Sequence, residues 1–310
     1  MIFSIFVIDR IANYGINRLS NKGLSWQYLI NTINQSRRPL DSIPYPYIYE
    51  QLILGQNNSI SECSNISFDN EPTTFNEETV TYTENKELII KERLIEKIRN
   101  IGSNRIYELV LNKCICFITT NYDDNLLGSI SPIDKSKQET KYSIRRQVNF
   151  THDKTKKTLW KIHGDLDSPK SIMLGVEHYS GSSAMIYEYF NGTYKRKQFK
   201  CKSIRQKIQA QEYSDINSWI DLFFSANIHI IGLNLDHAES DIWYVLILRA
   251  RLLKDSTYKG HIKNSIHFYY KEDEMPTCEN LMEACGIILH SSPVENDDWP
   301  GFYKKIIDSI

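Results

Sequence analysis

Three short polar motifs, each directly after an apolar run, contain the side chains best suited to chemistry. Thr119–Asp123 (TTNYD) follows Phe117-Ile118, His163–Asp165 (HGD) follows Leu159–Ile162, and Gly232–Asn234 (GLN) follows Ile228–Ile231. Short apolar runs of this kind predict buried strands. Because the carboxyl ends of parallel strands line the ligand crevice of an open α/β sheet, we expect an amide, an imidazole and a glycine to meet in one pocket.

The first motif offers an amide and a carboxylate. Asn121 has both donors and an acceptor, so it can orient a water or a ribose hydroxyl at a reacting carbon. Asp123 is then expected to hold the loop or the ribose of a bound nucleotide. A purely structural interpretation is open as well, because Asn and Asp after a strand often cap the next helix. The complete TTNYD string favours the binding interpretation more than an isolated Asn-x-Asp does.

The second and third motifs offer a base and a site of close backbone approach. An imidazole titrates near neutral pH, so His163 is suited to general-base work, and Gly164 permits a sharp turn. Gly232 would let the backbone approach a nucleotide, and Asn234 could bind a ribose. The alternatives are a structural histidine and an ordinary strand-ending turn. Asp241 opens the next predicted helix, where we expect it to act as a cap.

The surrounding pattern alternates strands and helices. Strands are predicted at 1–8, 114–119, 147–151 (an edge strand), 159–162, 171–174, 228–231, 265–270 and 286–289. Helices are predicted at 25–33, 43–54, 86–101, 105–111, over much of 176–225, and at 240–253, 280–284 and 299–307, with a polar excursion at 55–85. This order indicates an α/β fold with a doubly wound, mostly parallel Rossmann-like sheet. We expect one domain over 1–310, with helical insertions at 37–85 and 176–215.

Composition narrows the function classes. The formal net charge of the 310 residues is −1, which gives no electrostatic reason to expect nucleic-acid or membrane binding. No two of the six cysteines form a CxxC pair, so we expect no zinc module and no metal ligands. The apolar start at 1–8 is too short to span a bilayer. A cytoplasmic protein is therefore expected.

The order of the motifs, strand-TTNYD, then strand-HGD, then strand-GxN, resembles the sirtuin-like NAD-binding domain over most of the chain. The resemblance is greatest to the bacterial branch that destroys NAD during anti-phage defence. In that family the Asn and His of these motifs are the catalytic pair, which the resemblance places at Asn121 and His163. It places contacts to NAD at Gly232 and Asn234, and in the first motif at Thr120 and Asp123.

One segment departs from the family pattern. The family has Gly-Ala-Gly directly after its first strand, where backbone N–H groups cradle the pyrophosphate. This sequence has Asp9-Arg10-Ile11 there, and its first glycine is Gly15. Arg10 is the residue that could replace the cradle, as a direct partner of the phosphate.

The resemblance implies an NAD+ hydrolase that releases nicotinamide and ADP-ribose and is activated by a homo-oligomer or by a partner protein such as an ATPase or an argonaute. The altered first turn supports a second hypothesis, a catalytically weak or inactive nucleotide sensor or assembly subunit. A module that binds DNA or RNA directly is the least supported class, because neither charge nor motif indicates one.

Overall fold

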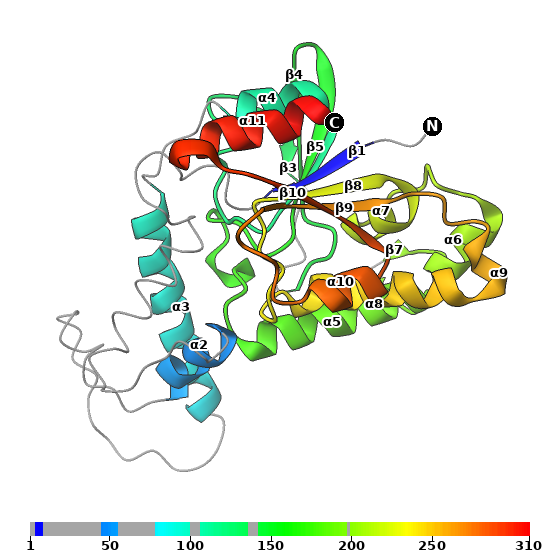
Figure 1. Cartoon of the computed structure of the whole chain (residues 1–310). Coiled ribbons are helices and arrows are strands. Elements are labelled where there is room, and N and C mark those ends of the chain that lie inside the picture. The colour runs from blue at the N-terminus through cyan, green and yellow to red at the C-terminus, as the bar shows by residue number, and fades with distance from the viewer. Residues whose placement is uncertain (1–3, 9–44, 55–77, 100–105, 136–141, 197–198) are drawn as a thin grey trace.

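The computed structural model describes residues 4–8, 45–54, 78–99, 106–135, 142–196 and 199–310 (Figure 1). Its main feature is an eight-stranded sheet with the order β10-β9-β8-β1-β2-β5-β4-β3. The strands are β1 (Ser4–Ile8), β2 (Cys116–Thr119), β3 (Pro132–Lys135), β4 (Gln147–His152), β5 (Thr155–Lys161), β8 (Asn227–Ile231), β9 (Ile266–Lys271) and β10 (Ile287–Ser292). A separate hairpin pairs β6 (Lys195–Arg196) with β7 (Phe199–Lys200).

The six strands from β10 to β5 are parallel, and β4 and β3 continue the sheet antiparallel. The chain starts in the middle at β1, builds outward through β2 and β5, and then returns to place β8 on the other side of β1. The order of strands therefore reverses between β1 and β8. Such a switch point is where open α/β sheets form their ligand crevice, beyond the carboxyl ends of the strands. The predicted doubly wound α/β class is confirmed.

Helices cover both faces of the sheet (Figure 1). One face packs against α5 (Val176–Asn191), α6 (Ile204–Ala210), α7 (Trp219–Ser225), α8 (Ser240–Lys254) and α10 (Glu279–Ala284), and the other against α4 (Ile106–Lys113) and α11 (Trp299–Ser309). The parallel strands are apolar on both sides: Ile228 and Ile230 face the first layer, and Ile231 faces the second. This two-sided burial explains why these strands are continuous apolar runs.

A third apolar cluster lies apart from these layers. Helices α2 (Tyr45–Leu54) and α3 (Glu78–Ile98) pack on each other and on four residues that follow β2 and β5: Tyr122, Leu166, Ile172 and Leu174. Figure 1 shows the two helices at one end of the sheet, where α2 adjoins the start of α5 and Glu50 Oε1 accepts the Val176 N–H (2.8 Å). The α2–α3 pair therefore adjoins the loops that contain the first two motifs.

Several details differ from the sequence predictions. In the described part of the chain β3, which was not predicted, is the edge strand, so β4 is internal. Residues 171–174 do not form the predicted strand. Ser171 ends a 3₁₀ turn that begins at Pro169, and the residues 172–174 that follow pair with no strand of the described chain. Helix α3 begins at Glu78, inside the predicted excursion at 55–85. The helix predicted at 25–33 lies outside the described residues.

Short helices complete the fold. They are α9 (Ser256–Lys259), the 3₁₀ turn at Pro169–Ser171 and a second 3₁₀ turn at Glu295–Asp297. Among the described helices, none contains an apolar stretch long enough to cross a bilayer.

Candidate active site

Asn121 and His163 lie at equivalent positions beyond two neighbouring strands. Thr119 of β2 is in register with Lys161 of β5, and each candidate follows its strand by two residues. The Ile162 N–H donates to the Thr119 carbonyl (3.0 Å), which continues the pairing past the strand ends. Both side chains are buried, with exposed fractions of 4% for Asn121 and 0% for His163. The structure thus places the predicted amide and imidazole at one edge of the sheet.

Lys161 ties the two loops together. Its side chain is fully buried, and its ammonium group donates to the Tyr122 carbonyl (2.8 Å) and pairs with Asp124 (2.7 Å) and Asp165 (3.1 Å). A buried ammonium needs such partners, because desolvation of an unpaired charge is costly. One cation therefore holds both the loop after β2 and the loop after β5.

Asp241 reaches the same place from the third motif. Its carboxylate lies 3.1 and 3.3 Å from His163 Nε2, and both side chains are fully buried. Ser182 Oγ on α5 donates to the same carboxylate (3.3 Å). Asp241 also accepts the Ile242 N–H (2.9 Å), but Glu239 occupies the N-cap position of α8, so the prediction that Asp241 serves as the cap is wrong.

The Asp241 contact determines which imidazole nitrogen is basic. A carboxylate only accepts hydrogen bonds, so the neutral His163 ring holds its proton on Nε2. The other nitrogen, Nδ1, is buried and has no hydrogen-bond partner among the described residues. Tyr179 packs edge-on against the ring, with the ring centroids 5.3 Å apart. The lone pair on Nδ1 is therefore not used by any hydrogen bond within the part of the chain that the structure describes.

A second carboxylate adds to the negative charge beside His163. Glu239 Oε2 lies 3.6 Å from His163 Nε2, and ligand atoms of His163, Glu239 and Asp241 all lie within 4.8 Å of one another. The sequence prediction named no metal ligand, whereas this group could hold a divalent cation by its donor types. The same carboxylates would also stabilise the imidazolium formed when His163 accepts a proton.

The other predicted binding residues have varied environments. Gly232 follows β8 at the switch point and has a φ of +74°, a left-handed conformation that favours glycine. Thr120 is fully buried, and its hydroxyl has no hydrogen-bond partner among the described residues. Asn234 is exposed on the loop after β8. Arg10 lies outside the described residues.

Asp123, the last residue of the first motif, is buried. Its Oδ1 accepts the Asn125 N–H (2.8 Å), which shapes the turn after Asn121. Burial raises the pKa of the Asp123 carboxyl from 3.8 to about 6, and the Asn125 N–H and the Lys161 charge offset only part of this effect. At neutral pH the Asp123 carboxyl is charged, and the desolvation of this charge lowers the stability of the folded protein.

We predict that this cost appears in the pH dependence of stability. Because the folded-state pKa of Asp123 is raised, the folded protein binds more protons than the unfolded chain between about pH 4 and 6, so stability falls as pH rises through that range. Asp123→Asn should remove this component and raise the free energy of unfolding at pH 7 by on the order of 1–3 kcal/mol. Urea unfolding of both proteins at pH 5 and pH 7.5 tests this, and an equal pH dependence in the two would contradict it.

Four members of the site are not predicted from the sequence: Lys161, Asp241, Glu239 and Ser182. One signal was present for Lys161, since a charged residue between Trp160 and Ile162 is unusual in a buried strand. No comparable signal marks Asp241, because an acidic residue in the first helical turn has an ordinary explanation in the helix dipole.

A comparison with protein families gives one match. Residues 115–204 match the SIR2-like domain. The matched segment contains β2, β5 and α5, and therefore Asn121, His163 and Ser182, but it ends before Gly232 and Asp241. No curated protein matches the sequence. The match supports a sirtuin-like domain at residues 115–204, and such a domain indicates a nucleotide-binding or NAD-related function.

Proposed function

We propose that the protein hydrolyses NAD+ to nicotinamide and ADP-ribose. The observation that carries the proposal is the His163–Asp241 pair. It lies beyond the carboxyl end of β5, next to the end of β2 that Asn121 follows. Hydrolysis of an N-glycosidic bond needs a held nucleophile and an acceptor for its proton. The amide and the imidazole supply these two functions, and the SIR2-like match of their segment supports NAD as the substrate.

In the proposed mechanism Asn121 holds a water molecule at C1′ of the nicotinamide ribose. The water oxygen bonds to C1′ as the bond from C1′ to the pyridinium nitrogen breaks, and the bond pair leaves with neutral nicotinamide. His163 Nδ1 takes the water proton, and Asp241 and Glu239 stabilise the resulting imidazolium. Burial of these groups excludes competing water and strengthens their electrostatic effect.

The binding residues follow from the same placement. We propose that Gly232 lets the backbone approach the dinucleotide at the switch point, and that Asn234 binds a ribose on the adjoining loop. Thr120 and Asp123 would shape the ribose side of the pocket. Arg10 would pair with the pyrophosphate in place of the Gly-Ala-Gly turn.

The biological role is proposed from the sirtuin-like resemblance. The whole chain would form one sirtuin-like domain, with insertions at 37–85 and 176–215, acting in the cytoplasm. It would deplete NAD as an anti-phage defence effector, after activation in a homo-oligomer or by a partner such as an ATPase or an argonaute.

The direct test is NAD turnover by the purified protein, alone and with the product of a neighbouring gene. Nicotinamide and ADP-ribose should appear in equal amounts. Asn121→Ala should lower the rate at least about 100-fold, because the nucleophile is no longer held at C1′. Circular dichroism would show that this variant is folded, and unchanged turnover in it would remove Asn121 from the mechanism.

The alternative is a nucleotide sensor or assembly subunit without catalysis. The Asp9-Arg10-Ile11 turn favours it, because Asp9 would repel the pyrophosphate that the family's glycines accommodate. In that case the protein would bind NAD or ADP-ribose in calorimetry and leave NAD intact in every assembly.

A further inference from the structure

A cavity of about 670 Å³ lies on the sheet face that α7 covers, away from the catalytic motifs. Its floor comes from β2, β4 and β5, and its walls from α7 and the loop at 211–216. Cys116 at the start of β2 is five residues before Asn121, so the cavity extends toward the opposite ends of the strands from the active site. The volume is typical of sites for small organic ligands.

The floor of this cavity is polar, whereas the face of a sheet that packs against helices is usually apolar. Gln147 and Asn149 of β4 and Thr158 of β5 point to this side, and Thr158 Oγ1 donates to Asn149 Oδ1 (2.9 Å). The alternate residues Val148 and Leu159, on the other face, are fully buried and apolar. The strands therefore present one packed face and one face suited to polar contact.

Within the described part of the chain, the residues that line the cavity provide hydrogen-bond donors and a positive charge, but no carboxylate. Trp160 is 3% exposed, and its indole N–H has no nitrogen or oxygen acceptor among the described residues. The Cys116 sulfur, which also lines the cavity, is at best a weak acceptor for it. The Asn149 amide nitrogen adds donors, and Lys156 contributes a positive charge. No carboxylate occurs among the described residues that line the cavity.

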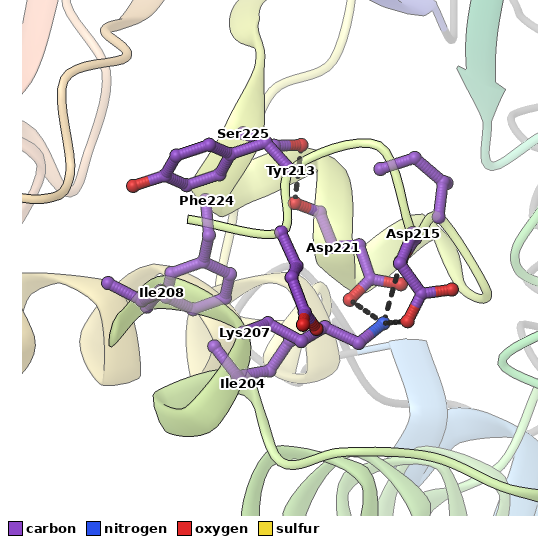
Figure 2. Close-up of a pocket in the computed structure, with 10 residues that line it drawn as sticks. Ile204, Lys207, Ile208, Tyr213, Asp215, Asp221, Phe224 and Ser225 are labelled. Carbon is purple, nitrogen blue, oxygen red and sulfur yellow. Dashed lines mark hydrogen bonds and ion pairs between the residues drawn. The ribbon is translucent and has the colours of Figure 1, made fainter. Parts of the chain in front are cut away.

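A second, much smaller hollow adjoins the cavity and differs from it in volume and in charge. Tyr213 and Ser225 border both, and Figure 2 shows them among the residues that line the smaller hollow. This hollow has a volume of about 10 Å³, so it holds at most one water. Its cation, Lys207, pairs with Asp215 (3.3 Å) and Asp221 (3.0 Å). That charge is already neutralised, whereas Lys156 is exposed.

We propose that the large cavity binds a small planar aromatic anion, separate from the NAD site. The aromatic ring would pack against Trp160 and Tyr213, with its acceptors at the Trp160 N–H and the Asn149 amide. Its carboxylate or phosphate would pair with Lys156. This proposal does not depend on NAD cleavage.

Fluorescence titration tests the proposal, because Trp160 itself lines the cavity. The probes are benzoate, an aromatic carboxylate, and AMP, an aromatic phosphate, and quenching by one of them identifies the anionic group. Lys156→Glu should weaken binding at least tenfold, and Trp160→Phe should remove most of the quenching. Lys154→Glu is the matched control, since this exposed lysine of the same hairpin does not line the cavity and should leave the affinity unchanged.

The results separate this cavity from the active site. Binding that Asn121→Ala abolishes and Lys156→Glu leaves unchanged would place the probe in the catalytic pocket and overturn the proposal. The absence of quenching by both probes in the unaltered protein would overturn it as well. Quenching that is lost in Lys156→Glu and kept in Asn121→Ala supports it.

Discussion

Replacing His163 with alanine should lower NAD cleavage about 10³- to 10⁴-fold, the upper part of the range for a positioned general base. The side chain is fully buried, so truncation also leaves a void. His163→Gln fills most of that void without supplying a base. It should lose as much activity as His163→Ala, but its free energy of unfolding should lie closer to that of the natural protein. Rates of nicotinamide release, with urea unfolding of both variants, provide the measurement. Substantial cleavage by a folded His163→Gln protein would assign the base elsewhere.

Asp241→Asn should lower the same rate about 10- to 10³-fold, because Asp241 is a positioning residue for His163. An amide can donate to Nε2 as well as accept from it, so it no longer fixes the proton on Nε2. It also lacks the charge that stabilises the imidazolium. The loss should appear in kcat more than in KM, which a merely structural role would not cause.

Ser182→Ala is the matched control for Asp241. Ser182 Oγ donates to the Asp241 carboxylate (3.3 Å), and the carboxylate keeps its contact with His163 when this hydroxyl is removed. We expect a change in rate of only a few fold, again without a change in KM. Equal losses in Ser182→Ala and Asp241→Asn would show that the cluster acts through packing alone.

Sequence reasoning located the strands and their terminal motifs because buried parallel strands leave a local signal. The run Ile228–Ile231 is apolar except for His229 and has isoleucines on both faces, and the polar motif that follows marks the carboxyl end. Parallel pairing then requires the ends of β2 and β5 to be neighbours, which brings Asn121 beside the loop of His163. This part of the site follows from topology.

The partners of these residues could not be predicted in the same way. His163 and Asp241 are separated by 78 positions, and their contact depends on how far the loop after β8 carries the start of α8. The false strand at 171–174 has a related cause. Its apolar residues, Ile172 and Leu174, pack on α2–α3, so tertiary contact rather than sheet pairing explains their burial.

Gly164→Ala should destabilise the protein by at least about 3 kcal/mol, because the methyl group has no space and the backbone disfavours it. Gly164 has a φ of +124°, and a Cβ there would lie 2.6 Å from Ile172 Cα and 2.7 Å from the Ser171 carbonyl oxygen. These are backbone atoms that cannot move aside cheaply. The His163 carbonyl next to it accepts the Met173 N–H (2.8 Å), so any shift also disturbs the loop that contains His163.

Gly260→Ala is the control for this substitution. Gly260 has a φ of −73°, and a Cβ there would meet no atom within 4 Å. Alanine at this position should be neutral or slightly stabilising, since it restricts the unfolded chain without strain in the folded one. Urea unfolding of both variants separates the effect of the steric clash at Gly164 from the general effect of replacing a glycine with alanine. Equal stability of the two would mean that the loop after β5 adapts, and that the close approach at Gly164 does not hold His163 in place.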